Sequence, residues 1–330
     1  MAKDLPEVAF LTTKDSPIHP VAESILMNVS SIKYVSTPGW SFDENVLKNV
    51  TNAKAILVRV GVVTKEVMEA APKLGVIAVH GIGVDRVDLE EAQKRGIVVT
   101  NTALANTVAV AEHTLGLTIC LIKRIPASDR LVKEGKWKQA QFSGGQLMNM
   151  TVGIVGLGNI GTKVAKRLRS FEAKVVSYDP YVPSERFEEL GAESVSLEAL
   201  LKESDIVTIH LPLTRFTRHL IKERELRMMK KEASIVNTSR GPIIDEKALY
   251  VALRDKWISS AALDVFEEEP LAQNNPLLKL DNVILTPHVA GSTNEANRRM
   301  AETTAKDILR VLRGEKPVHE YRKELLPYPV

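Results

Sequence analysis

The segment from Thr151 to Asp179 constrains the fold of this chain more than any other part of its sequence. An apolar strand runs into the glycine-rich turn Gly156-Leu157-Gly158-Asn159-Ile160-Gly161, and an amphipathic helix and a second strand follow. In such a turn the first glycine allows a tight bend, the second lets the backbone approach a pyrophosphate, and the third lets the helix pack closely on the strand. The helix N-terminus adds free N–H groups and a positive dipole end. The segment therefore predicts a β-α-β unit that binds a dinucleotide through Gly156, Gly158, Asn159, Ile160 and Gly161.

The acid at the end of the second strand, Asp179, predicts which dinucleotide is bound. A carboxylate in this position accepts hydrogen bonds from the ribose hydroxyls of NAD and repels the 2′-phosphate of NADP. The following Pro180-Tyr181 supplies no arginine that would offset the repulsion. We therefore expect NAD as the cofactor.

Short β-branched runs alternate with amphipathic segments along the whole chain, a pattern typical of doubly wound α/β domains. In the first third, strands are expected at residues 8–12, 33–35, 55–59, 76–80 and 97–101. Further strands are expected at residues 152–155, 174–178, 206–210, 234–238, 261–265 and 283–285. The expected helices include residues 64–71, 89–95 and 197–202. The sequence thus predicts an α/β protein with two parallel-sheet domains.

The glycine-rich turn opens the second set of strands, so the first set is expected to form a smaller domain of its own. A long apolar helix at 109–123 would link the two sets, and a helix at 294–312 would return to the first domain. We therefore expect a Rossmann NAD-binding domain, residues 103–290, inserted into a flavodoxin-like substrate-binding domain made of residues 1–102 and 291–330.

The composition is that of a soluble globular protein, with 44% apolar and 26% charged residues and a formal net charge of only +3. Neither a nucleic-acid surface nor a membrane surface is expected, because Lys and Arg are scattered among Asp and Glu. Cys120 is the only cysteine, and the N-terminus carries no apolar signal segment, so we expect a cytoplasmic protein. No metal site is expected.

Three polar residues follow predicted strands at the end where ligands gather in open α/β sheets. His288 lies in Thr286-Pro287-His288 and is suited to proton transfer, because the ordinary pKa of histidine is close to working pH. Arg240 carries a fork of donors that matches a carboxylate or a 2-oxo acid. Glu269 closes the run Glu267-Glu268-Glu269. Taken alone, His288 could instead be a structural histidine that caps a strand, and Glu269 part of a solvated acidic loop.

Several motifs together resemble the signatures of the D-isomer-specific 2-hydroxyacid dehydrogenases. They are ALDVFEEEP at 262–270, NTSRGPIIDEKAL at 237–249, TPHVAG at 286–291, GIGVDRVDLEEA at 81–92 and NTALANTVAVAEHT at 101–114. They occur in the family's order, and the resemblance extends from about Ala55 to Gly314. It implies an enzyme that interconverts a D-2-hydroxy acid and its 2-oxo acid, with the D-configuration resting on the resemblance alone.

The resemblance also implies a role for each motif residue. Arg240 is expected to bind the substrate carboxylate and carbonyl, His288 to be the acid/base, and Glu269 to hydrogen-bond His288. A carboxylate behind an imidazole fixes its tautomer and favours its protonated form. The residues expected to line the cofactor site are Thr238, Ser239, Arg240, Asp264, His288 and Gly291.

The substrate is less closely defined. Its carboxylate is expected to lie against the backbone N–H groups of His80-Gly81-Ile82-Gly83. Arg59 either adds a positive charge facing the substrate or is a surface arginine at the end of a strand. Within the family, the sequences of segments 58–59, 178–181 and 191–214 are most similar to phosphoglycerate dehydrogenases, so 3-phosphoglycerate is one possible substrate. However, Val60-Gly61-Val62 replaces the small polar residues usual after that arginine, segment 137–141 is less basic than expected, and the extra regulatory domain of long phosphoglycerate dehydrogenases is not expected. Hydroxypyruvate and glyoxylate therefore remain alternatives.

A function of a different class is also open. Some corepressors that resemble this family sense NAD without catalysis, and a few of them keep the Arg240, Glu269 and His288 set. The helix 109–123 is apolar on more than one face, and such a helix must be buried on nearly all sides. We therefore expect a homodimer that packs through this helix and the segment to Gln146, although burial between two domains of one chain would also account for it.

Overall fold

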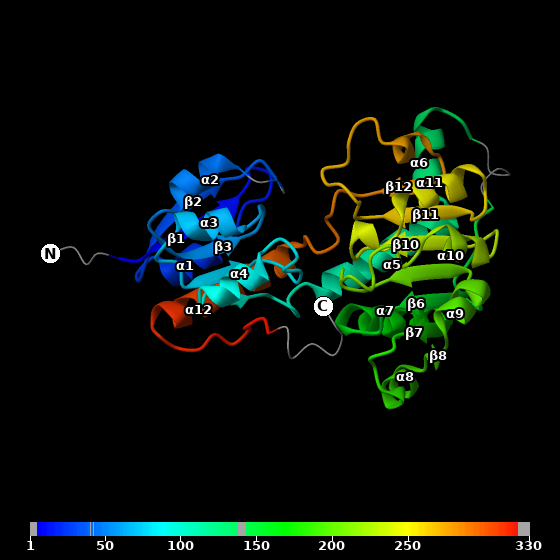
Figure 1. Cartoon of the computed structure of the whole chain (residues 1–330). Coiled ribbons are helices and arrows are strands. Elements are labelled where there is room, and N and C mark those ends of the chain that lie inside the picture. The colour runs from blue at the N-terminus through cyan, green and yellow to red at the C-terminus, as the bar shows by residue number, and fades with distance from the viewer. Residues whose placement is uncertain (1–4, 40, 42, 138–142, 323–330) are drawn as a thin grey trace. The chain divides into compact units, whose positions relative to one another are not determined.

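A computed structural model describes residues 5–39, 41, 43–137 and 143–322 of the chain (Figure 1). The described residues divide into two compact units. Unit 1 contains residues 5–106 and 292–322, and unit 2 contains residues 107–291. The chain thus leaves unit 1, completes unit 2, and then returns to unit 1.

Unit 1 is a parallel sheet of five strands in the order β2-β1-β3-β4-β5. The strands are β1 (Glu7–Thr12), β2 (Ser31–Ser36), β3 (Ala53–Val58), β4 (Val76–Val79) and β5 (Val98–Thr100). Its helices are α1 (Val21–Leu26), α2 (Glu44–Asn49), α3 (Lys65–Ala70), α4 (Leu89–Lys94) and α12 (Asn294–Leu312). This order is that of flavodoxin-like domains, in which ligands bind where the strand order reverses, between β1 and β3.

Both faces of the unit 1 sheet are covered. Alternate residues of β1 enter different cores: Val8 and Phe10 pack with α1 and α12, whereas Ala9 and Leu11 pack with α2, α3 and α4. The return helix α12 therefore completes the core of unit 1, and it packs against α1, β3 and β4. A strand that is buried on both faces needs apolar residues at every position, which explains the unbroken run of Val8–Leu11.

Unit 2 is a parallel sheet of seven strands in the order β12-β11-β10-β9-β6-β7-β8. The strands are β6 (Thr151–Val155), β7 (Lys174–Tyr178), β8 (Glu193–Ser194), β9 (Ile206–Ile209), β10 (Ser234–Asn237), β11 (Ser260–Leu263) and β12 (Val283–Leu285). The helices are α5 (Thr107–Lys123), α6 (Ile125–Lys133), α7 (Asn159–Ser170), α8 (Ser184–Leu190), α9 (Leu197–Glu203), α10 (Glu223–Met228) and α11 (Glu246–Arg254), with 3-10 turns η2 (Gly241–Ile243) and η3 (Pro276–Lys279). Helices α5, α7 and α8 cover one face of the sheet, and α9, α10 and α11 cover the other.

The predicted fold class is confirmed: both units are doubly wound parallel sheets, and the strand order of unit 2 reverses between β6 and β9, as in a Rossmann fold. The expected strands all form, but several end earlier than expected. Arg59, His80, His210 and Thr238 lie just beyond their strands, at the carboxyl edge of each sheet. The two-residue strand β8 was not expected, because its polar sequence Glu193–Ser194 carries no strand pattern.

No helix within the described ranges combines the length and the apolar character that a membrane crossing requires.

Candidate functional site

The glycine-rich turn has the geometry that a dinucleotide needs. Gly156 has φ +96°, a left-handed conformation that favours glycine. A Cβ at Gly161 would lie 2.0 Å from the carbonyl oxygen of Gly156, so the start of α7 and the turn touch backbone to backbone. A Cβ at Gly158, in contrast, would meet nothing within 4 Å. The open space beside Gly158, next to the first N–H groups of α7, fits a pyrophosphate.

Asp179 is tied to that turn. One carboxylate oxygen accepts a hydrogen bond from the N–H of Leu157 (2.8 Å) and the other from the N–H of Tyr181 (3.0 Å). Each carboxylate oxygen has a second lone pair, so the group remains able to accept hydrogen bonds from ribose hydroxyls. The residues present thus fit NAD: a turn for the phosphates and a fixed carboxylate for the ribose.

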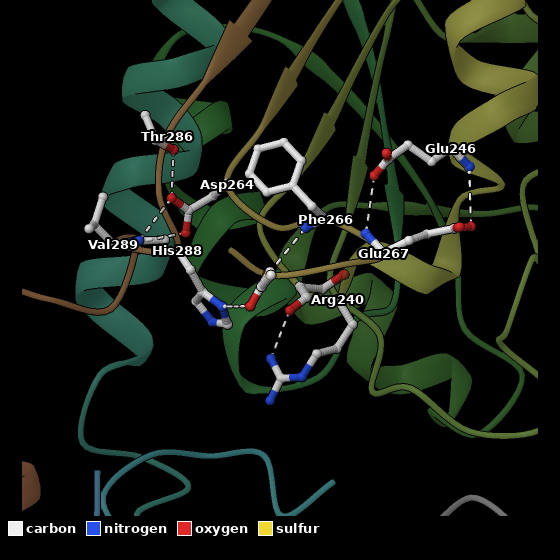
Figure 2. A network of polar contacts seen from close by, with 11 residues as sticks. Arg240, Glu246, Asp264, Phe266, Glu267, Thr286, His288 and Val289 are labelled. Atoms are coloured by element: carbon white, nitrogen blue, oxygen red, sulfur yellow. Dashed lines mark hydrogen bonds and ion pairs between the residues drawn. The ribbon is translucent and has the colours of Figure 1, made fainter. Parts of the chain in front are cut away.

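Arg240 follows β10 in a turn that is shaped by Asn237. The Asn237 side chain accepts hydrogen bonds from the N–H and the hydroxyl of Ser239 and donates one to the carbonyl of Arg240. The guanidinium of Arg240 donates to the carbonyl of Ser239 at 2.7 Å. Figure 2 shows the side chains of Arg240 and His288 pointing to the same side of the network. Thr238, which precedes this turn, is buried and shares a hydrogen bond of 2.8 Å with Thr114 of α5.

His288 and Glu269 form a direct pair. The imidazole Nδ1 lies 2.9 Å from Glu269 Oε2, and the second carboxylate oxygen accepts from the N–H of Phe266 (3.2 Å). The Glu269 side chain is only 10% exposed, whereas that of His288 is 35% exposed. Because Nδ1 donates to the carboxylate, Nε2 is the nitrogen that can exchange a proton with a substrate. The pair therefore has the arrangement of a general acid with its orienting carboxylate.

Asp264 holds the loop that carries His288. Its side chain is fully buried and accepts hydrogen bonds from the Thr286 hydroxyl (2.5 Å) and from the N–H groups of Val289 (3.0 Å) and Ala290 (2.8 Å). The main chain of Asp264 accepts the N–H of His288, whose φ of +55° is left-handed. The sequence predicted Asp264 as a cofactor residue; the structure adds this fastening of residues 286–290, which end one residue before Gly291.

His113 joins the same network and was not predicted. Its Nε2 lies 3.2 Å from the Thr286 hydroxyl and 3.6 Å from Asp264 Oδ1. His113 is on α5, far from both partners in sequence, and only its place in the motif at 101–114 hinted at a function. The helix α5 thus contacts the ends of two strands through the neighbouring residues His113 and Thr114.

The acidic run 267–269 is divided between two tasks. Glu269 binds His288. Glu267 accepts a hydrogen bond from the N–H of Glu246 (3.3 Å) and donates its own N–H to the Glu246 carboxylate (3.1 Å), as Figure 2 shows. Glu267 also pairs with His219 (2.7 Å). Glu267 therefore fastens the loop to the start of α11. Among the residues that the structure describes, no group of three or more His, Cys, Asp or Glu side chains could hold a metal ion.

A second cluster lies in unit 1, at the carboxyl ends of β3 and β4. The guanidinium of Arg59 is 3.0 Å from His80 Nδ1 and donates to Asn297 Oδ1 at 3.0 Å. Burial lowers the pKa of Arg59 from its ordinary value. Burial, and secondly the charge of Arg59, lower the pKa of His80 to about 3, so His80 is neutral near pH 7. Asn297 was not predicted as part of this cluster, because it comes from the distant helix α12.

The glycine loop after β4 is held by hydrogen bonds from residues 101 and 102. Gly81 has open space where a Cβ would be, and its carbonyl accepts the N–H of Thr102 at 2.9 Å. The carbonyl of Ile82 accepts a hydrogen bond from the Asn101 side chain (2.7 Å). Two carbonyls of the loop His80–Gly83, those of Gly81 and Ile82, are thus engaged by Thr102 and Asn101. Part of segment 137–141, whose basic character bears on the substrate, lies outside the described residues.

Comparison with known proteins identifies the family. A model of the NAD-binding domain of D-isomer specific 2-hydroxyacid dehydrogenases matches residues 115–290. A glyoxylate reductase from Thermofilum pendens is 45% identical over 296 residues, which cover 86% of this chain and 85% of the relative. The chain belongs to the D-isomer specific 2-hydroxyacid dehydrogenase family. It is an NAD-dependent oxidoreductase that interconverts a D-2-hydroxy acid and its 2-oxo acid by hydride transfer.

Other relatives in the family carry different substrate names. A D-3-phosphoglycerate dehydrogenase from Methanocaldococcus jannaschii is 44% identical over 301 residues, which are 91% of this chain and 57% of that relative. The structure of D-lactate dehydrogenase from Aquifex aeolicus complexed with NAD and lactic acid matches with a TM-score of 0.84 at 32% identity, covering 93% of this chain and 96% of that one. An NADPH-dependent glyoxylate/hydroxypyruvate reductase from Sinorhizobium meliloti matches with a TM-score of 0.83 at 27% identity, covering 96% of each chain.

Proposed function

We propose that this enzyme reduces a short 2-oxo acid, of the size of glyoxylate or hydroxypyruvate, to its D-2-hydroxy acid with NADH. The observation that carries the proposal is the pair His288–Glu269, 2.9 Å apart, on the same sheet edge as Arg240. A proton donor with an orienting carboxylate and a fork of cationic donors is what keto-acid reduction requires. Relatives at 45% and 46% identity carry the name glyoxylate reductase, which supports the choice of substrate class.

Each residue of this set has a separate task. When bound, NADH supplies the hydride that is added to C2 of the 2-oxo acid. Arg240 binds the carboxylate and the carbonyl oxygen, and it stabilises the negative charge that develops on that oxygen. His288 donates the proton on Nε2 to the same oxygen, while Glu269 retains the proton on Nδ1 within its hydrogen bond. The product is the 2-hydroxy acid, and His288 regains its proton from water.

The cofactor would be held by two groups of residues. The turn Gly156–Gly161, with Gly158, Asn159 and Ile160 at the start of α7, faces the pyrophosphate, and Asp179 accepts the ribose hydroxyls. The nicotinamide end would lie against Thr238, Ser239, Asp264 and Gly291. The fixed Asp179 carboxylate, held by two backbone N–H groups, supports a preference for NADH.

The substrate's other contacts would come from unit 1, from Arg59 and the backbone of His80–Gly83. Of the residues Arg59, His80 and Asn297, only Arg59 carries a charge at neutral pH, because the pKa of His80 is lowered to about 3 by burial and by Arg59. One positive charge suits a carboxylate better than a phosphate dianion. A second candidate, 3-phosphoglycerate, rests on the 44% identity to a D-3-phosphoglycerate dehydrogenase.

A panel of 2-oxo acids tests the proposal. The consumption of NADH is followed with glyoxylate, hydroxypyruvate, pyruvate and phosphohydroxypyruvate at matched concentrations. We expect the highest kcat/KM for one of the unphosphorylated acids. A clear preference for phosphohydroxypyruvate would replace the first candidate by the second. No turnover of any acid by a protein that still binds NADH would favour a non-catalytic NAD-sensing scaffold.

The role of His288 has its own test. His288→Ala removes the proton donor, so we expect kcat to fall by roughly 10²–10⁴ with little change in NADH affinity. Turnover within about tenfold of the parent would exclude His288 as the acid.

We also propose that the protein is a homodimer that packs through α5, α6 and the residues that follow. Helix α6 has no buried residue, and Ile125, Val132 and Trp137 are exposed by 46%, 56% and 77%. On α5, Ile119, Leu121 and Ile122 are only partly buried. Large apolar side chains gathered in this way are typical of obligate interfaces. Light scattering at micromolar protein is expected to give the mass of two chains, and the mass of one chain would refute the dimer.

The cytoplasm is the proposed location, because the chain has a single cysteine and small net charge. Recovery of the protein in any other fraction of the cell would contradict this assignment.

A further inference from the structure

The cation of Arg59 is held without an anion. Its Nη1 contacts two neutral groups, the His80 ring (3.0 Å) and the Asn297 amide oxygen (3.0 Å), and its buried Nε has no hydrogen-bond partner. Within the described ranges Arg59 makes no ion pair. Partly buried arginines are usually paired with carboxylates, because an unpaired charge in a low-dielectric site is unfavourable. An arginine with neutral partners is therefore prepared for an anion from outside the chain.

The location of Arg59 agrees with that conclusion. It follows β3 directly, beside β1, and its N–H and that of Val60 both donate to the carbonyl of Leu11 on β1. This is the position where the strand order of the sheet reverses, which is where ligands bind in open α/β sheets. His80 lies at the matching end of the neighbouring strand β4.

His80 contributes a neutral acceptor. Burial and the charge of Arg59 lower its pKa to about 3, so at neutral pH one ring nitrogen keeps a lone pair that faces the guanidinium. His80 as a whole is only 6% exposed, and its ring is therefore held by the surrounding residues. His80 thus orients Arg59 and adds no charge of its own.

Asn297 contributes the second neutral acceptor, from the first turns of α12. Arginine is a donor only, so the side-chain atom of Asn297 that faces it is the amide oxygen. An aspartate has nearly the same shape and would reach the same point. It would form a charge-assisted hydrogen bond with Arg59 and satisfy its charge within the protein.

We propose that His80 and Asn297 are positioning residues that hold the Arg59 guanidinium in place and leave its charge uncompensated for the anionic group of the substrate. This inference rests on the proposed role of Arg59 in substrate binding. The anionic group is a carboxylate or a phosphate, and an unphosphorylated and a phosphorylated 2-oxo acid distinguish the two. The two neutral acceptors fix the direction of the guanidinium, and neither carries a negative charge that would compete with the substrate for it.

The decisive variant is Asn297→Asp. The new carboxylate pairs with Arg59, so we expect KM for the preferred 2-oxo acid to rise by about tenfold or more, while kcat stays within about threefold. NADH affinity should be unchanged, and the melting temperature should be equal or higher, because a buried cation becomes paired. The matched control is Asn294→Asp, which adds the same charge to an exposed position of the same helix and should leave KM unchanged. A stable Asn297→Asp protein with the parent KM overturns the inference.

Arg59→Gln separates this inference from the proposed function. If Arg59 binds the substrate, Arg59→Gln raises KM, and Asn297→Asp added to it causes no further rise. An unchanged KM in Arg59→Gln refutes the substrate-binding role of Arg59 itself. A raised KM in Arg59→Gln together with the parent KM in Asn297→Asp refutes only the inference.

Two His80 variants test the inference independently if Asn297→Asp does not fold. His80→Gln retains a neutral acceptor, whereas His80→Leu removes it, so we expect KM to be about tenfold higher in His80→Leu than in His80→Gln. Equal KM values for these two variants would overturn the role of His80. The ratio of the two KM values should be the same whether the 2-oxo acid that the enzyme accepts is phosphorylated or not.

Discussion

Gly241 lies directly after Arg240, at the start of η2, and there is no room for a side chain at this position. A Cβ there would lie 1.9 Å from both the carbonyl carbon and oxygen of Phe266, and 2.5 Å from the nitrogen of Glu267. Real Cβ atoms essentially never come closer than 3.0 Å, so Gly241→Ala must move one of the two backbones by at least 3.0 − 1.9 = 1.1 Å. Both atoms are main chain, and no flexible side-chain end can yield instead.

One of these two backbones, at Phe266, supports the His288–Glu269 pair, and the other directly follows Arg240. The N–H of Phe266 donates to Glu269 Oε1, and Glu269 Oε2 is 2.9 Å from His288. A misplacement of about 1 Å in a catalytic constellation costs roughly 10² in rate, or about 2.7 kcal/mol in activation free energy. Overpacking also lowers the free energy of unfolding by about 1–3 kcal/mol. We therefore expect Gly241→Ala to be folded, less stable, and about a hundredfold slower.

Three measurements check this prediction. Steady-state turnover with the preferred 2-oxo acid gives kcat, and thermal unfolding reports the loss of stability. The third measurement is NADH affinity, which should be unchanged because the turn at Gly156–Gly161 is untouched. Gly75→Ala is the control, since its Cβ would meet only the carbonyl of Lys54 at 3.8 Å, an ordinary contact. A folded Gly241→Ala protein with kcat within about threefold of the parent would refute the reasoning, because the close approach would then not position Glu269.

Three further predictions concern charge. Asp179→Ala should reduce the ratio of kcat/KM for NADH to that for NADPH, because it removes both the acceptor for the ribose hydroxyls and the repulsion of the 2′-phosphate. A parent enzyme that already prefers NADPH in paired kinetic assays would contradict this prediction. Glu269→Gln should lower kcat for keto-acid reduction, since an amide binds and orients the His288 ring less firmly than a carboxylate, and an unchanged kcat would remove this role from Glu269. Burial lowers the pKa of His210 to about 3, below that of an unfolded histidine near 6.5, so its neutral form stabilises the fold above pH 6.5 and this stability is lost as the pH falls toward 3. His210→Leu should therefore show a shallower fall in melting temperature over this range, and a fall as steep as the parent's would show that His210 does not cause it.

The fold was largely predictable because its central strands, such as β1, β3, β4 and β6, are buried on both faces. Such strands read as continuous apolar runs, and these runs located β1, β3, β4 and β6 to within two residues. The same apolar runs do not show where a strand ends. Arg59 and His80 were expected inside strands, although each lies in a bend directly after its strand, because the residue type does not show where the bend begins.

The candidate site was predictable where its residues are close in sequence or belong to a known motif. The contact of Glu269 with His288 was expected, and the structure contains it. The contact between Arg59 and Asn297 joins residues 238 positions apart, and the contact between His113 and Thr286 joins residues 173 apart. No local pattern signals such pairs, because they depend on how helices return to a sheet.

The imidazole of His288 and the guanidinium of Arg59 are partnered in opposite ways, and the difference has a physical reason. His288 has a carboxylate, Glu269, and Arg59 has an amide, Asn297. An imidazole has to gain and lose a proton in each turnover, so a neighbouring carboxylate helps it by stabilising the charged form. A guanidinium is charged throughout, so a carboxylate beside it would neutralise the charge that an anionic substrate needs. Glu269→Gln should therefore lower kcat with little change in KM, whereas Asn297→Asp should raise KM with little change in kcat.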